Sequence, residues 1–279
     1  MKPARKTLLC SLLLLLQTCV ALAQPIQSVA VPNALATIEG NSSTSDPFTS
    51  TSFRFQQVFD ASQFAFLPGY AVITGIGFRV DVASTMGAAF FFAGSTIKLS
   101  TTTRAPDGLS SVFSDNVGAD AVTIFNGAIG LGSDYQAGAN PQPFNPNNIG
   151  TTTPFYYFPQ HGNLLLDIRV VGGQVLFPGS LDSQNAVGDS VSRVFAASNL
   201  AASGTADTLG LVAQFQFVAI PEPSTSALAI LGAGMTMLFL RRRSDGPLRS
   251  GCKRVPQAGA MSLGRCITTL WALSKTSLT

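Results

Sequence analysis

Two aspartates are the residues of this chain best suited to acid–base chemistry. Hydrolysis of a glycosidic bond needs two facing carboxyl groups, and Asp81 and Asp167 fall in two runs that are expected to form facing strands. Most other aspartates stand beside glycine, asparagine or serine, as residues that form turns do. One hydrolytic alternative therefore stays open, an exported carbohydrate-active, glycosidase-like enzyme that uses this Asp pair.

Other kinds of catalysis find no support in the sequence. A serine or cysteine nucleophile needs a histidine base, and the only histidine, His161, falls in an expected turn. The sequence has no Gly-x-Ser-x-Gly elbow, no zinc-ligand spacing and no Gly-x-x-x-x-Gly-Lys loop. We therefore expect a protein that is not an enzyme and has no catalytic residues.

Calcium is the one ion that the residue types leave open, because it takes carboxylate, amide and carbonyl oxygens. Two stretches offer such oxygens: Asp115, Asn116 and Asp120 in the first, and Asp182, Asn185 and Asp189 in the second. Neither has the Asp-x-Asp-x-Asp-Gly order of an EF-hand, and turn formation explains both without a metal. We expect no cofactor, with a structural calcium ion as the alternative.

Exposed aromatic rings could stack on the rings of sugars. The candidates lie within, flank or follow a stretch rich in proline, asparagine and glycine at 132–153: Tyr135, Phe144, Phe155, Tyr156, Tyr157 and Phe158. The other interpretation is that Phe155, Tyr157 and the run at 90–92 belong to the core, where a β-sandwich needs large apolar side chains. Extracellular polysaccharide is the partner that the first interpretation implies.

The distribution of charge argues against a nucleic-acid partner. The whole chain has a formal net charge of +3, but residues 24–220 carry six basic and twelve acidic side chains. Such an acidic domain offers phosphate backbones no counter-charge. Residues 24–220 also contain no cysteine, since the four cysteines are Cys10, Cys19, Cys252 and Cys266. The domain must therefore be held together by burial and not by disulfide bonds.

Short runs of valine, isoleucine, phenylalanine and threonine between turn-forming residues predict an all-β domain over residues 52–219. The expected strands are 52–59, 71–82, 95–101, 121–130, 163–171, 174–177, 191–196 and 209–218, with a hairpin at Gly172 and Gly173. Residues 132–153 are expected to form a long surface loop, and residues 24–51 a flexible N-terminal segment. We expect a two-sheet β-sandwich that is jelly-roll-like, with a closed barrel as the alternative.

Residues 1–23 have the features of a secretory signal peptide. Basic residues at positions 2–6 precede an apolar run at 8–16, and Ala21 and Ala23 provide a small-x-small cleavage site. A lipoprotein signal built on Cys19 is the alternative, but residues 16–18 are a poor context for lipid attachment. The domain that follows is therefore expected to be exported.

Residues 220–243 combine three features in a fixed order: the rigid Pro221-Glu222-Pro223 element, an apolar run at 226–240, and the basic cluster Arg241, Arg242 and Arg243. At a rise of ~1.5 Å per residue, the apolar run would span roughly 23 Å as a helix, less than the ~30 Å of a bilayer's hydrocarbon. Arginines prefer the cytoplasmic side. We expect a short transmembrane helix with the β domain outside, and an ordinary C-terminal anchor is the alternative.

The three features together resemble the PEP-CTERM sorting signal of bacterial exported proteins, over residues 218–243 only. The resemblance implies that a membrane-embedded exosortase recognises Pro221, Glu222 and Pro223 and processes the protein. Family members reach the cell surface, often in species that make exopolysaccharide. A second stretch, 153–169, looks like a segment of other PEP-CTERM-type surface proteins, for which we expect a structural role. Neither resemblance implies an activity for the β domain.

Residues 244–279 depart from the family's pattern, because such proteins usually stop soon after the basic cluster. This stretch is basic and has no sustained periodicity, so we expect a disordered cytoplasmic tail. Together, the residues and the resemblance predict a non-enzymatic exported surface or extracellular-matrix protein associated with exopolysaccharide or the envelope. It would be anchored in the inner membrane first and reach the cell surface or the medium after processing.

Overall fold

The computed structural model describes residues 25–67, 69–220 and 234. The expected signal peptide with its cleavage site at Ala21 and Ala23 lies outside these residues. The expected sorting signal, from Pro221, Glu222 and Pro223 to Arg241, Arg242 and Arg243, also lies outside them apart from Gly234. The expected tail at 244–279 lies outside them too. In the described part of the chain, no helix combines the length and the apolar character that crossing a membrane requires.

Antiparallel strands make up most of the described domain, which confirms the all-β expectation. The helical elements there are short 3-10 turns: η1 (Asn33–Leu35), η2 (Ala61–Phe64), η3 (Phe113–Asn116) and η4 (Pro159–His161). The strands are β1 (Gln27–Val31), β2 (Ser42–Thr44), β3 (Ser52–Phe59), β4 (Ala71–Phe78), β5 (Ala88–Thr102), β6 (Val122–Ser133), β7 (Asn145–Tyr157), β8 (Asn163–Pro178), β9 (Leu181–Asn185), β10 (Val191–Ala196), β11 (Thr205–Asp207), β12 (Leu209–Leu211) and β13 (Ala213–Ala219).

The strands form three sheets with the orders β1-β13-β4-β7, β11-β10-β3-β8-β5-β6 and β12-β9-β2. The pairing is nested along the chain, since β3 pairs with β8, β4 with β7, and β5 with β6. The middle pair belongs to the four-stranded sheet and the other two pairs belong to the six-stranded sheet. A long antiparallel ribbon thus folds from one large sheet to the other and back.

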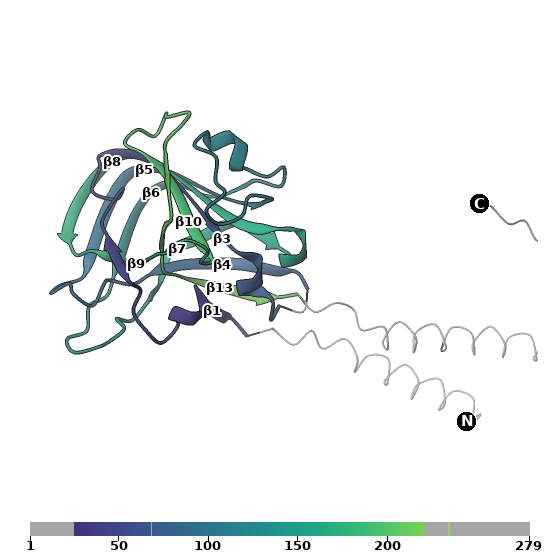
Figure 1. Ribbon diagram of the computed structural model, residues 1–279, viewed down its shortest axis with the longest axis horizontal. Coiled ribbons are helices and arrows are strands. Elements are labelled where there is room, and N and C mark those ends of the chain that lie inside the picture. Colours follow the sequence, from purple (N-terminus) through teal and green to yellow (C-terminus); the bar gives the residue numbers. More distant parts are fainter. Residues whose placement is uncertain (1–24, 68, 221–233, 235–279) are drawn as a thin grey trace, which may run out of the picture. The chain divides into compact units, whose positions relative to one another are not determined.

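The core lies between the two larger sheets (Figure 1). Phe59 of β3 packs edge-on against Phe215 of β13, with the ring centroids 4.8 Å apart. Phe48 enters the same core from the segment before β3 and contacts the rings of four further phenylalanines. At one edge, the Thr152 hydroxyl of β7 donates a 2.9 Å hydrogen bond to the Ile124 carbonyl of β6, which joins the two sheets. Aromatic burial therefore holds together a domain without cysteines.

The hairpin expected at Gly172 and Gly173 is wrong, because β8 runs without interruption through both glycines. Instead of forming a turn, the two glycines allow β8 and β5 to approach each other closely. A Cβ on Gly172 would lie 2.8 Å from the Cβ of Ala93 in β5, and Gly172 has a φ of +67°. Gly173 lies against the ring of Phe92 in the same strand. Glycine inside a strand often marks such a contact.

The long loop expected at 132–153 is also wrong over its second half. Residues from Asn145 onward form β7, which pairs with β4 along the edge of the four-stranded sheet. Local composition favoured a loop, since this stretch is rich in proline and asparagine. The partner strand supplies a ladder of hydrogen bonds, and Ile149 is fully buried, so tertiary pairing overrides the local preference.

The segment 24–51 is not the flexible one that its polar composition predicted. Residues Gln27–Val31 form β1, which pairs with β13, and Ser42–Thr44 form β2, which pairs with β9. Val31 and Phe48 are buried in the core. A few apolar residues, placed where neighbouring strands expose unpaired edges, are enough to order a segment that is otherwise polar.

Candidate functional site

Asp81 and Asp167 belong to two separate hydrogen-bond networks and do not form the expected pair. Asp167 lies on β8 in the six-stranded sheet, where it binds Arg54. Asp81 follows β4 of the four-stranded sheet and lies with Glu39 and Asp182. Asp167 lies on a strand of the six-stranded sheet, whereas Asp81 lies after the end of β4 in the four-stranded sheet, and sequence pattern alone could not predict this separation.

The first network, the Arg54 cluster, consists of Arg54, Gln56, Asn116 and Asp167. Alternation along β3 puts Arg54 and Gln56 on one face, opposite Asp167 on β8. The Asp167 Oδ2 accepts a hydrogen bond of 3.0 Å from Arg54 Nη2 and one of 2.7 Å from Gln56 Nε2. The Asn116 amide donates to Gln56 Oε1, and the Arg54 guanidinium lies 4.3 Å from the Phe113 ring centroid. This cluster ties β3, β8 and η3 together.

The second network, the Arg79 cluster, consists of Glu39, Arg79, Asp81 and Asp182. Arg79 and Asp81 flank the buried Val80, which forms a bridge to Leu181 beside Asp182. Arg79 Nε donates to Asp182 Oδ2 over 2.7 Å, and Arg79 Nη2 donates to the Ile38 carbonyl over 2.6 Å. Arg79 and Asp182 are both fully buried. Hydrogen bonds of these side chains join the segment before β2 to β9 and to the residues that follow β4.

The Arg79 cluster has more negative than positive groups. Carboxylate oxygens of Glu39, Asp81 and Asp182 all lie within 4.8 Å of one another, and Asp182 forms a salt bridge with Arg79. Burial raises the pKa of Asp182 to about 6; Arg79 opposes this rise, and the nearby Glu39 adds to it. Glu39 Oε1 accepts from the Val82 N–H, whereas its Oε2 is buried without a hydrogen-bond partner among the described residues. Protonation of Asp182 reduces the negative charge of the cluster.

The same oxygens are of the type that a hard cation prefers. They are not the sets expected from the sequence, from which only Asp182 takes part. Asp115 accepts from the Ser110 hydroxyl, Asp120 accepts from the Thr101 N–H, and Asn116 belongs to the Arg54 cluster. All three residues of the first set therefore already take part in hydrogen bonds within the protein. In the second set, Asn185 pairs with Asn41, and Asp189 caps the N–H of Val191.

The expected aromatic platform is divided between core and surface. Phe155 and Tyr157 are buried, as the core interpretation predicted, whereas Tyr156 of the same strand is 55% exposed. Phe158 stacks on Tyr70 at a centroid distance of 4.8 Å. His161 packs edge-on against Phe158, also at 4.8 Å, so the only histidine belongs to an aromatic surface group.

An open cavity of about 440 Å³, the aromatic pocket, lies where β5 begins and where β6 and β8 end. Its lining includes Tyr135, Phe177 and Asp134, together with Ser133 and Met86. Tyr135 is 39% and Phe177 57% exposed. The sequence predicts Tyr135 as a ring that could stack on a sugar, but it predicts only a strand at Phe177. Only the continuous course of β8 brings Phe177 to this end of the domain.

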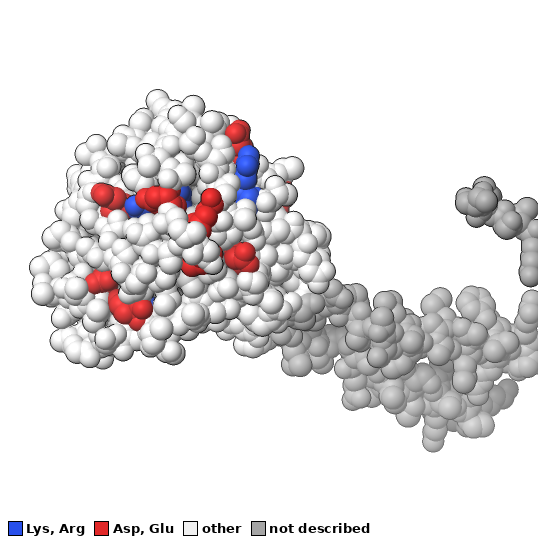
Figure 2. All heavy atoms as spheres, in the orientation of Figure 1, with Lys and Arg blue, Asp and Glu red and all other residues white. Residues whose placement is uncertain are grey.

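Charge on the surface agrees with the expectation of an acidic domain. Figure 2 shows acidic side chains spread over one face, with few basic ones between them. Arg54, Arg79 and Arg193 are buried and bound to aspartates, so they contribute little positive surface.

No family model matches this chain, and no similar curated protein or solved structure was found. Function therefore has to be inferred from the chain's own residues.

Proposed function

We propose that this protein is a non-enzymatic surface or extracellular-matrix protein, exported by its N-terminal signal and sorted by an exosortase-type membrane enzyme. The β domain would lie outside the inner membrane, held by the apolar run at 226–240, and would reach the cell surface or the medium after processing. There it would associate with exopolysaccharide or the envelope. Nucleic acid is not a partner in this proposal.

The observation that carries the proposal is the order of segments at the C-terminal side of the domain. The last strand, β13, ends at Ala219, and the Pro221-Glu222-Pro223 element begins two residues later in the chain. An apolar run and three arginines follow. A sorting signal has to be accessible to its membrane enzyme, and a signal that begins directly after the last strand meets this need.

We infer further that the domain is a two-sheet β-sandwich of the jelly-roll type. In a jelly roll, a long antiparallel ribbon is wound so that successive strand pairs alternate between two facing sheets. The nested pairs β3–β8, β4–β7 and β5–β6 follow this order. Sandwiches of this kind place binding residues in the loops and strand ends at one end of the fold.

The aromatic pocket supports polysaccharide as the ligand. Tyr135 and Phe177 expose rings on which a sugar could stack, and Asp134 offers a carboxylate that can accept hydrogen bonds from sugar hydroxyls. An open pocket at the surface suits a chain that continues in both directions better than a small isolated ligand.

Sorting is tested by following the full chain in a host that has an exosortase and in one that lacks it. We expect a shortened, surface-exposed form only in the first host. A variant in which Pro221 and Pro223 are both alanine should remain full-length in the membrane. Recovery of intact, dissolved chain from the cytosol of both hosts would contradict the proposal.

Glycan binding is tested on a glycan array, with a hydrolysis assay run in parallel. We expect binding without hydrolysis, and about a tenfold weaker affinity after Tyr135→Ala or Phe177→Ala, which corresponds to a loss of about 1.4 kcal/mol. Tyr156→Ala is the matched control, because Tyr156 is an exposed tyrosine that does not line the pocket. Product release from any glycan would show instead that the protein is an enzyme.

A further inference from the structure

All four strands of the four-stranded sheet have an end on the same side of that sheet. β13 ends there at Ala219, which pairs with Ala71 at the start of β4, and Ala71 also pairs with Tyr157 at the end of β7. β1 begins on the same side, because Gln27 pairs with Phe217. Residues just beyond these strand ends and after η2 form a surface that we call the exit face: Ile26, Phe66, Tyr70, Phe158, His161 and Ile220.

Contacts between rings and one backbone bond join the residues of the exit face. Tyr70 stacks on Phe158 at a centroid distance of 4.8 Å, and His161 packs edge-on against both rings. The Ile220 N–H, just after β13, donates to the Tyr70 carbonyl over 2.9 Å. The chain therefore leaves the last strand of the domain directly beside these rings.

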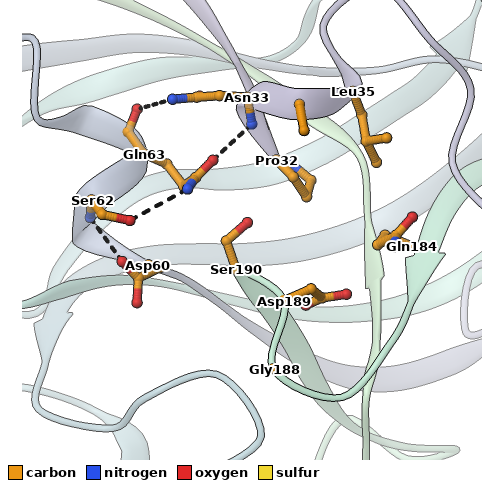
Figure 3. Close-up of a pocket in the computed structure, with 11 residues that line it drawn as sticks. Pro32, Asn33, Leu35, Asp60, Ser62, Gln63, Gln184, Gly188, Asp189 and Ser190 are labelled. Atoms are coloured by element: carbon orange, nitrogen blue, oxygen red, sulfur yellow. Dashed lines mark hydrogen bonds between the residues drawn. The ribbon is translucent and has the colours of Figure 1, made fainter.

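The segment that carries Phe66 is fixed by contacts within the domain. Phe66 follows η2, and its ring centroid lies 5.5 Å from that of the buried Phe217. Figure 3 shows how η2 is joined to η1, at one wall of an open cavity. The Asn33 N–H donates to Gln63 Oε1 over 2.7 Å, and the Asn33 side-chain amide donates to the Gln63 carbonyl over 3.0 Å. The ring of Phe66 is thus held in place before any partner binds.

The exit face is apolar and exposed. Phe66 is 52% and Tyr70 42% exposed, and Ile26 is exposed as well, although large apolar side chains are usually buried. No lysine, arginine, aspartate or glutamate occurs among the described residues of the segments that form this face: 25–27, 65–72, 156–162 and 217–220. The domain as a whole is acidic, so the exit face differs from the rest of its surface. An exposed apolar patch of this kind marks an interaction site.

The length of the chain that follows decides which partner this surface meets. Five residues separate Ile220 from the apolar run at 226–240. The six steps from Ile220 to Ser226 span at most about 22 Å when fully extended. A domain of about 200 residues has a radius of gyration of about 16 Å, so it is wider than this linker is long. With the run in the bilayer, the domain cannot turn its exit face far from the lipid.

We propose that the exit face rests on the outer surface of the inner membrane, with the rings of Phe66 and Tyr70 among the lipid headgroups. This inference rests on the proposed function, because it needs the run at 226–240 in the bilayer. Aromatic rings favour the boundary between water and lipid, and a surface without charged groups can leave water at little cost. The contact holds Ile220, and the start of the Pro-Glu-Pro element after it, at the level where a membrane-embedded enzyme acts.

The same arrangement directs the aromatic pocket away from the membrane. β8 begins at Asn163, two residues after His161 of the exit face. It ends at Pro178, next to Phe177 of the aromatic pocket. A strand of 16 residues extends over about 50 Å, so the two surfaces lie at opposite ends of β8. The pocket proposed to bind polysaccharide then faces outward, where the polymer is.

Quenching of tryptophan fluorescence by brominated lipid tests the contact in the full chain. Trp271, the only tryptophan, is replaced by phenylalanine, and Tyr70→Trp then provides a single reporter. The chain is reconstituted in phosphatidylcholine vesicles with or without bromine on the acyl chains. We expect bromine to lower the fluorescence at least about twofold, because an interfacial side chain lies close to the acyl chains. Tyr135→Trp in the same background is the matched control, since Tyr135 is similarly exposed but lines the aromatic pocket, and it should not be quenched.

Loss of a neighbouring apolar side chain should weaken the contact. Phe66→Ser should reduce the quenching of the Tyr70→Trp reporter by about half, and Ile26→Ser should reduce it by less, because interfacial binding scales with buried apolar area. Leu200→Ser is the matched control. Leu200 is also exposed, but it lies beyond the end of β10, whereas the first residue of β10 pairs with Phe59 just before η2. Thermal unfolding checks that each variant is folded.

Flotation of the vesicles separates failure of this inference from failure of the proposed function. Chain that floats with the vesicles without quenching of Tyr70→Trp would overturn this inference alone, and so would equal quenching of Tyr135→Trp or unchanged quenching in both serine variants. Chain that does not float would overturn the membrane anchor and this inference with it. Pairing of two chains that shields Tyr70→Trp from the lipid would assign the exit face to a second copy and overturn the inference as well.

Discussion

The Arg54 cluster and the Arg79 cluster place the same ion pair, arginine with aspartate, in two different surroundings. In the Arg54 cluster one guanidinium faces one carboxylate, and neutral Gln56 and Asn116 complete the network. In the Arg79 cluster the guanidinium binds Asp182, whose carboxylate lies within 4.8 Å of those of Glu39 and Asp81. Both arginines are buried, at 6% exposure for Arg54 and 0% for Arg79. The comparison shows that an equally buried pair can be electrically balanced or can keep an excess of negative charge.

This difference indicates what each cluster can do. In the Arg54 cluster one guanidinium matches one carboxylate and the other partners are neutral, so we assign this cluster a structural role. The excess charge of the Arg79 cluster makes the stability of the fold sensitive to protonation, because burying uncompensated carboxylates is costly. Four predictions test this contrast, in order of decreasing effect.

Removal of the guanidinium should have the largest effect, and a larger one in the Arg79 cluster. We expect Arg79→Met to lower the free energy of unfolding by about 4 kcal/mol and Arg54→Met to lower it by about 3 kcal/mol. The first change leaves Asp182 without its cation beside the carboxylates of Glu39 and Asp81, whereas Asp167 keeps its hydrogen bond from Gln56. Urea unfolding of residues 24–220 at pH 7.5 measures both values. Equal losses would remove the proposed contrast between the clusters.

Loss of a neutral partner should be the next effect. Gln56→Leu removes the bond to Asp167, a second one to the Phe113 carbonyl and the acceptor for Asn116. We expect a loss of about 2 kcal/mol, because the buried partners are left unsatisfied. Gln214→Leu on β13, at a half-buried position, is the control and should change the stability by less than about 0.5 kcal/mol. A Gln56 variant as stable as this control would show that the network does not stabilise the fold.

Acidity should affect stability through Asp182, whose pKa is raised in the folded state to about 6. The folded state then binds a proton more tightly than the unfolded chain, so this contribution is greatest below the ordinary pKa of aspartate and is lost as the pH rises through 6. We expect the wild-type domain to lose roughly 1 to 2 kcal/mol between pH 4.5 and pH 7.5 relative to Asp182→Asn. Urea unfolding at a series of pH values gives both curves, and parallel curves would refute the assignment.

Removal of one surplus carboxylate should have the smallest effect and the opposite sign. Glu39→Gln keeps an oxygen that can accept from the Val82 N–H and removes one negative charge from the Arg79 cluster. We expect a stabilisation of up to about 1 kcal/mol at pH 7.5. Asp115→Asn, which removes an exposed charge elsewhere, should change nothing. Destabilisation by Glu39→Gln would mean that Glu39 is needed as a charged group.

Local patterns predicted part of the fold accurately. The expected strands 52–59 and 191–196 coincide with β3 and β10, because both are short apolar runs bounded by turn-forming residues. The same kind of reasoning failed for β7, β8 and β1, where a neighbouring strand or a close glycine contact decided the outcome. Strand pairing joins residues far apart in the chain, and local composition carries little information about it.

The sequence by itself determined the acidic, cysteine-free character of the domain, its β-strand content and the order of the segments on which the proposed export and sorting depend, because these depend on composition and on neighbours along the chain. Only the tertiary structure decided which polar groups meet. Glu39 reaches Asp81 and Asp182 because β2 pairs with β9, and Asp60 shares a pocket with Asp189 because η2 lies beside the loop before β10. Strand register and sheet order bring together groups that are more than a hundred residues apart in the chain. The spacing of residues within a local run does not predict these contacts.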